Sequence, residues 1–147
     1  MSEFLDIWEK SVVSGEDINS VKAEGLLPTN WYEGQIQTVE GRIVDKTDNA
    51  LFGKTVAHCA VDLYTDDGKV KKFWFDALPD QIRSTTGRLT TASKNGAYLA
   101  TATGTVGKSF KETMTQAMQS RLKFRISLAE GKNGQSSKNW LNEIKAA

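Results

Sequence analysis

The stretch Lys69-Val-Lys-Lys-Phe-Trp-Phe-Asp-Ala77 has the alternating pattern of a β-strand. On a strand, Phe73 and Phe75 point to one side and Trp74 points to the other. Two aromatic residues on one face are typical of a strand that lies on a hydrophobic core. On the opposite face, Trp74 beside Lys72 suits either a second packed layer or a surface on which a flat, anionic ligand stacks. The functional interpretation depends on which of these environments Trp74 occupies.

Two further strand patterns come before this stretch. Residues 31–44 change phase beside glycines, which predicts a long strand bent by a bulge. Residues 56–64 alternate again, and Thr65-Asp-Asp-Gly68 carries the Asp-Gly signal of a hairpin turn. Together with 69–77, these segments predict three antiparallel strands in a meander.

The second half of the chain predicts a helix and a hairpin. Ser109-Phe-Lys-Glu112 is a capping-box pattern, and apolar residues follow it at helical spacing, so we expect a helix over 110–121. Residues 122–128 and 138–144 read as a fourth and a fifth strand. A turn at Gly131-Lys-Asn-Gly134 joins these two strands.

Residues 78–108 are rich in Ser, Thr, Gly and Ala. A segment of this length without secondary structure is unusual inside a compact domain. We therefore expect either a mobile functional loop or an extra hairpin, with a short strand at 97–102.

The order of elements predicts a mainly β fold. Three meander strands, a helix and a two-stranded hairpin are the elements of the oligonucleotide-binding fold, a five-stranded Greek-key barrel with a helix between strands three and four. Residues 3–12 have the pattern of a short amphipathic helix. The chain thus divides into an N-terminal helical segment, 1–25, packed on a barrel domain, 26–147, with a long polar insertion near 78–108. A β-sandwich with a helical insertion is the alternative.

Charge is polarised along the chain although the net charge is only +1. Residues 82–138 contain ten Lys and Arg against two acidic residues, an excess typical of an anion-binding face. A chance clustering of surface lysines accounts for it equally well. The single cysteine, Cys59, excludes an internal disulfide and favours a reducing cytoplasm. One His and one Cys cannot build a conventional zinc site, so no metal or other cofactor is predicted, and no apolar run is long enough for a membrane span.

Catalytic motifs are weak. Gly104-Thr-Val-Gly-Lys-Ser109 resembles part of a phosphate-binding loop, but Ala102 stands where the full pattern needs its first glycine. The repeated strand–helix units of a nucleotide-binding sheet are also missing. His58 and Cys59 are neighbours on a strand and point to opposite faces, so they cannot act as a nucleophile and its base. The sequence predicts a protein that is not an enzyme.

Binding of single-stranded nucleic acid has more support. Such binders combine aromatic platforms for the bases with cations along the backbone. The predicted strands and loops supply both, and we interpret Trp31 and Trp140 as core or barrel-end residues. The predicted nucleic-acid-binding residues are Arg42, Lys46, Lys54, His58, Tyr64, Lys72, Trp74, Arg88, Lys94, Arg125, Lys132 and Lys138.

Short motifs spread over the whole chain resemble small phage-encoded single-stranded DNA-binding proteins. They are Phe4-Leu-Asp-Ile-Trp-Glu9, Leu27-Pro-Thr-Asn-Trp-Tyr-Glu-Gly34 and Asn139-Trp-Leu-Asn-Glu-Ile-Lys145. The resemblance implies an oligonucleotide-binding barrel in phage DNA replication or recombination, acting in the host cytoplasm. Its implied partners are single-stranded DNA and phage or host replication proteins, and a homodimer is left open.

The chain departs from this family in two respects. The acidic C-terminal tail by which many members recruit partners is replaced by Glu-Ile-Lys-Ala-Ala, and the insertion near 78–108 is longer and more polar than expected. The competing hypothesis is a phage protein–protein interaction module, such as an inhibitor of a host factor, which uses the same barrel face.

Overall fold

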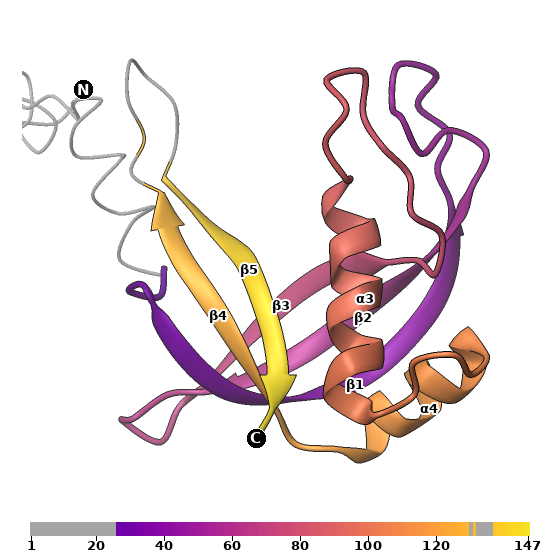
Figure 1. Cartoon of the computed structure of the whole chain (residues 1–147). Helices are drawn as coiled ribbons and strands as arrows, with labels where there is room; N and C mark the ends of the chain where they lie inside the picture. Colours follow the sequence, from indigo (N-terminus) through magenta and orange to yellow (C-terminus); the bar gives the residue numbers. More distant parts are fainter. Residues whose placement is uncertain (1–25, 130, 132–136) are drawn as a thin grey trace, which may run out of the picture.

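A computed structural model of the chain describes residues 26–129, 131 and 137–147 (Figure 1). The predicted helix over 3–12, and with it the whole N-terminal segment 1–25, lies outside the described residues.

Five antiparallel strands form one curled sheet that resembles half of a barrel (Figure 1). The order across the sheet is β3-β2-β1-β4-β5, so β3 and β5 are its two end strands. All five strands were predicted, and the mainly β class is confirmed. The strands are β1 (Asn30–Ile43), β2 (Thr55–Tyr64), β3 (Val70–Ala77), β4 (Leu122–Ala129) and β5 (Lys138–Ala146).

The sheet curls along the long strand β1, which pairs with a different strand on each side over different parts of its length. Its first residues, Asn30 to Gly34, pair with β4, and β2 pairs with it from Glu33 to Ile43. The register with β2 shifts between Ile36 and Thr38, which confirms the predicted bulge. Gly34 is required where β1 pairs with both β2 and β4, because a Cβ there would lie 2.8 Å from the carbonyl oxygen of Asp62.

The predicted turn between β2 and β3 and the predicted helix over 110–121 are also confirmed. Gly68 has φ +79°, and its N–H donates to the Thr65 carbonyl at 3.0 Å, which closes the predicted turn. Helix α4 (Phe110–Gln119) begins after Ser109, whose hydroxyl accepts a hydrogen bond from the Glu112 N–H at 3.2 Å.

The segment 78–108 contains a helix that the sequence analysis missed. The prediction of a short strand at 97–102 was wrong, because these residues belong to α3 (Thr91–Thr103). The buried face of α3 consists mainly of small or polar residues, so it lacks the large apolar periodicity that marks a helix; the buried residues are Ala92, Ser93, Asn95, Gly96 and Leu99. The expected hairpin is reduced to one bridge between Arg83 and Leu89.

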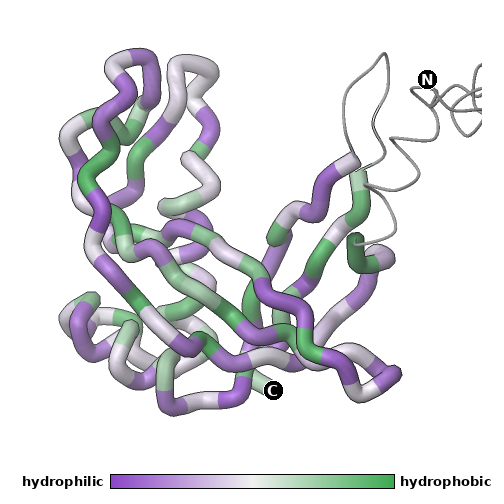
Figure 2. Tube along the Cα trace, turned by 180° about the vertical axis from the view of Figure 1, so that it is seen from behind, coloured by the Kyte–Doolittle hydropathy of each residue, from purple (hydrophilic) through white to green (hydrophobic). Residues whose placement is uncertain are grey.

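The main hydrophobic core fills the concave side of the sheet, where α3 and α4 cover it (Figure 1). Phe75 lies in this core with its ring centroid 6.1 Å from that of Phe124, as expected from the alternation in β3. A smaller cluster of Leu51, Val56, Leu78 and Ala92 lies under the β1–β2 connection. Figure 2 shows polar and apolar residues alternating along the strands, which is typical of a sheet with one buried face. Neither helix of the described ranges is long and apolar enough to cross a membrane.

Candidate nucleic-acid interface

A cleft of about 470 Å³ lies between the two end strands and the first turn of α3. β3 and β5 do not pair with each other, so the curl of the sheet leaves their edges on either side of this opening. Both edges bring a tryptophan to it: Trp74 from β3 is 55% exposed, and Trp140 from β5 is 51% exposed. The cleft therefore has an accessible indole on each of two opposing strands.

Hydrogen bonds between side chains of α3 and the backbone of other segments hold the third wall of the cleft in place. The Asn95 side-chain amide donates to the carbonyl of Asp76 at 2.9 Å, which joins the helix to the end of β3. Ser93 donates to the carbonyl of Asp80 at 2.7 Å and accepts from the Ile82 N–H at 2.9 Å. Buried polar groups with such partners position the helix as well as satisfying their own hydrogen-bonding capacity.

Trp74 lies on the outer face of β3, opposite Ala60 of β2. Its exposure shows that, within the described part of the chain, no second layer of structure buries it. Of the two environments considered for the opening strand, Trp74 occupies the accessible one with respect to residues 26–129, 131 and 137–147.

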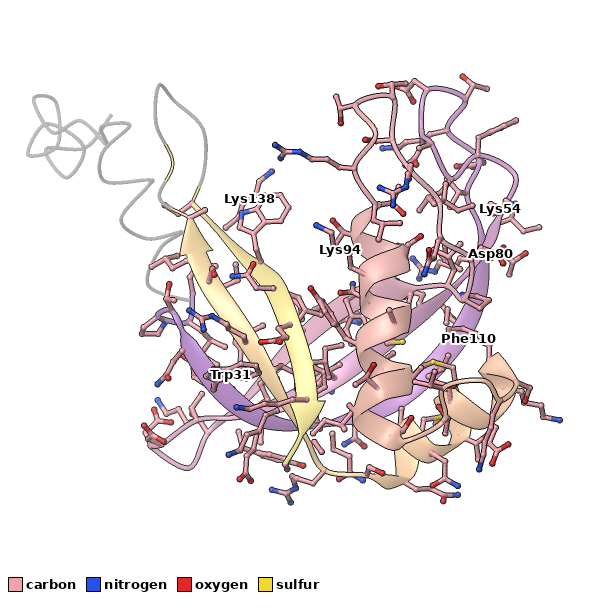
Figure 3. All side chains as sticks on the ribbon, in the orientation of Figure 1. Trp31, Lys54, Asp80, Lys94, Phe110 and Lys138 are labelled. Atoms are coloured by element: carbon pink, nitrogen blue, oxygen red, sulfur yellow. The ribbon has the colours of Figure 1, made fainter. Side chains whose placement is uncertain are left out.

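The exposure of Trp140 contradicts its interpretation as a core residue. Lys138 Nζ lies 5.8 Å from the centroid of the Trp140 ring, so the first residues of β5 combine a cation with an aromatic surface. A small hollow beside Trp140 is also lined by Lys94 and Tyr98 of α3. Figure 3 shows Lys94 on the side of α3 that faces β5, with Lys138 near the start of β5.

The missed signal at Trp140 was a repeated spacing. Lys72 precedes Trp74 by two residues, and Lys138 precedes Trp140 by two residues. On a strand, this spacing places the cation and the indole on the same face. Both end strands of the sheet carry the pair.

Three predicted residues on β1, β2 and β3 lie beside acidic groups. Arg42 contacts Glu40 at 2.7 Å, and Lys72 contacts Asp62 at 3.5 Å. His58 Nδ1 is 2.7 Å from an oxygen of Asp76. Arg42 and Lys72 are thus each paired with a carboxylate, and the outer face of β1–β3 contributes mainly Trp74 to an anion-binding surface.

The loop cations are separated from the strand cations. Lys46 and Lys54 belong to the β1–β2 connection, where Lys54 Nζ is 3.8 Å from Asp80 (Figure 3). Arg88 is exposed in the connection between β3 and α3. Lys132 lies outside the described residues. From the predicted set, the structure thus brings Trp74 to the cleft and places Lys138 and Lys94 near Trp140 at its edge.

The remaining predicted residues, Tyr64 and Arg125, contribute to a different surface. The guanidinium carbon of Arg121 lies 4.5 Å from the centroid of the Tyr64 ring, and that of Arg125 lies 6.0 Å from the Trp31 ring. Trp31 is half-buried on the outer side of the sheet near the start of β1, where Lys145 Nζ approaches its ring to 4.1 Å, so it is not a core residue.

Groups that could serve catalysis are poorly placed in the described residues. Burial, and secondarily the charge of Asp76, raises the pKa of the Cys59 thiol to about 12, so Cys59 is a poor nucleophile. Across the ranges 26–129 and 137–147, no group of three or more His, Cys, Asp or Glu side chains could hold a metal ion. The segment 104–109 is the connection from α3 to α4: Gly104 ends α3 with φ +69°, and Lys108 lies 3.6 Å from Glu112.

The chain matches no protein-family model, and no curated protein matches its sequence.

Proposed function

We propose that this protein binds single-stranded DNA without sequence specificity, in the cleft between β3, β5 and α3. The observation that carries the proposal is the pair Trp74 and Trp140, two half-exposed indoles that line one cleft from opposing strands. Stacking on an aromatic side chain is worth about 1–3 kcal/mol per base and tolerates every base, since each has a π-face. Duplex DNA, whose bases are already stacked and paired, lacks the free faces that this site would bind.

Two cations near Trp140 support the proposal. Lys138 lies beside Trp140, and Lys94 lines the neighbouring hollow. In the bound state, a base would stack on an indole while the adjoining phosphate meets one of these ammonium groups. These contacts read neither base edges nor groove shape, so the proposed binding is independent of sequence.

The sheet supports an oligonucleotide-binding barrel as the finer description of the fold. In the order β3-β2-β1-β4-β5, the bent β1 lies at the centre and the two end strands flank an opening. A partly open five-stranded barrel that binds oligonucleotides through its strands and adjoining loops has this form. Together with the resemblance of the sequence motifs, it favours a non-enzymatic role in phage DNA replication or recombination, in the host cytoplasm.

Titration with oligo-dT, followed by tryptophan fluorescence, tests the proposal. We expect quenching on binding, an affinity that falls steeply with salt, and much weaker binding to a duplex of the same length. If no single strand binds in a salt-sensitive manner, the proposal is wrong.

A further inference from the structure

The outer face of β1, β4 and β5 carries two rows of paired residues that the cleft does not use. In the first row, Glu33 lies opposite Tyr64 on one side and opposite Lys123 on the other, and Lys123 lies opposite Lys145. In the second row, Arg125 lies between Trp31 and Glu143. Residues paired across an antiparallel sheet point to the same face, so the rows form one surface. We call this surface the outer basic face and define it by Trp31, Tyr64, Arg121, Lys123, Arg125 and Lys145.

Cations and aromatic rings alternate on the outer basic face. Lys145 Nζ lies 4.1 Å from the Trp31 ring centroid, with Arg125 on the same ring at 6.0 Å. Arg121 lies 4.5 Å from the Tyr64 ring. A shallow groove of about 390 Å³ between the rings is lined by Trp31, Tyr64 and Lys123. These are the two kinds of group that bind single-stranded nucleic acid.

Cations outnumber acidic side chains on the outer basic face. Its four cations have three acidic neighbours: Glu33 is 3.5 Å from Arg121, Glu143 lies opposite Arg125, and Asp66 lines the groove together with Glu33. Lys123 and Lys145 are directly opposite each other, and like charges in this position destabilise a sheet. An anion bound between these two lysines would remove that repulsion.

The outer basic face is continuous with the cleft across β5. Trp140 lies opposite Ser127 of β4, and Trp31 lies opposite Arg125, only two residues along the same strand. Ser127 and Arg125 are about 7 Å apart along β4, and Trp140 and Trp31 lie on its two sides, about 10 Å apart across the sheet, so about 12 Å separates their backbones. The row from Tyr64 to Lys145 crosses four strands, or about 14 Å. A flexible strand that leaves the cleft beside Trp140 can therefore continue to Trp31.

We infer that the outer basic face is a second contact surface for the single-stranded nucleic acid held in the cleft, so that the strand wraps over β5. This inference rests on the proposed function. It predicts two components of binding that differ in the length of strand they need: a short oligonucleotide fills the cleft, and a long one also contacts Trp31, Tyr64 and the surrounding cations.

A charge-matched pair of double variants tests the inference. Lys123→Ala/Lys145→Ala removes the repelling pair and leaves the core untouched, and Lys108→Ala/Lys111→Ala removes the same charge beside α4. Binding of labelled oligo-dT of about 6 and about 20 nucleotides, one near the lower limit of site sizes for such folds and one above the upper limit, is measured by fluorescence anisotropy over a series of salt concentrations. We expect Lys123→Ala/Lys145→Ala to weaken binding of the long strand about tenfold and to reduce its salt slope by about 1.4. Its affinity for the short strand should equal that of the control.

The outcomes separate the inference from the proposed function. If the two double variants bind the long strand equally, with equal salt slopes, the outer basic face is not a contact surface, while the cleft proposal stands on short-strand binding. If the wild-type protein fails to bind the short strand, the cleft proposal itself is wrong. The inference that one strand contacts both the cleft and the outer basic face is then wrong as well.

Discussion

Trp74 and Trp140 come from strands at opposite ends of the sheet, yet both line a single cleft. The bend in β1 produces this relationship, because one strand pairs with β2 along most of its length and with β4 at its start. Each end strand also places a lysine two residues before its tryptophan. A base held in the cleft therefore meets an indole from each side, whereas only Lys138 is a cation near its tryptophan ring, since Lys72 is paired with Asp62.

Replacing either tryptophan should weaken binding without unfolding the protein. We expect Trp74→Ala and Trp140→Ala each to raise the Kd for short oligo-dT roughly 5- to 150-fold, the equivalent of one lost stacking contact. Both side chains are more than half exposed, so each truncation removes little core packing. Fluorescence anisotropy of a labelled oligonucleotide measures the affinity independently of the missing indole, and circular dichroism checks the fold.

Val106→Ala is the matched control for the two tryptophan variants. Val106 is 72% exposed in the connection between α3 and α4, outside the cleft, so its truncation should leave the Kd unchanged. Unfolding of Trp74→Ala would place Trp74 in packed structure and contradict its role as a stacking platform.

Lys138 should contribute a phosphate contact. We expect Lys138→Ala to reduce the slope of log Kd against log salt by about 0.7, the value for one contact to a single strand. Lys111→Ala removes the same charge from the exposed side of α4 and should leave the slope at the wild-type value. Equal slopes for Lys138→Ala and Lys111→Ala would show that Lys138 does not meet the backbone of the strand.

The parts of the fold that sequence predicted are those with strong local chemistry. The Asp-Gly turn before Gly68, the cap at Ser109 and the period-2 alternation of the strands all act within a few residues, and all were correct. Helix α3 was missed because its packing depends on small residues, which carry no hydrophobic periodicity. Gly96 faces the backbone of Leu78, a contact that only the folded chain creates.

The candidate site was predictable in residue type and less so in location. Trp74 was identified because alternation separated it from Phe73 and Phe75. The carboxylate partner of Lys72 on the β1–β3 face was missed because it depends on cross-strand register, which brings Asp62 to Lys72. Trp31 was misplaced for the same reason, since its partners Arg125 and Lys145 are distant in sequence.

Cys59 should make stability depend on pH in the alkaline range. Burial holds the thiol pKa at about 12 in the folded protein, well above the ordinary value, so the folded state keeps this proton after the unfolded state has lost it. Stability from this group is thus complete below about pH 8.5 and falls as the pH rises toward 12; by pH 10 the loss is about 2 kcal/mol.

Urea unfolding of the wild-type protein and of Cys59→Ala at pH 7 and pH 10 measures this effect. Cys59 is fully buried, so Cys59→Ala should be less stable at pH 7, and the difference should shrink by about 2 kcal/mol at pH 10. A constant difference between the two proteins would show that the thiol titrates normally.

Gly96→Ala should destabilise the fold and disturb the cleft together. A Cβ at this position would lie 2.0 Å from the carbonyl oxygen of Leu78, which is a backbone atom and cannot rotate away as a side chain could. Helix α3 would have to move off the end of β3, and the Asn95 contact with Asp76 that positions the cleft wall would be lost. We expect the free energy of unfolding in urea to fall by about 3 kcal/mol or more, at the upper end for overpacked sites, together with weaker binding of short oligo-dT.

Ala97→Ser is the control, because it changes the exposed neighbour in the same helix and should stay within about 0.5 kcal/mol of the wild-type stability. If Gly96→Ala is as stable as Ala97→Ser, the close packing of α3 against residue 78 is wrong, and the third wall of the cleft is wrong with it.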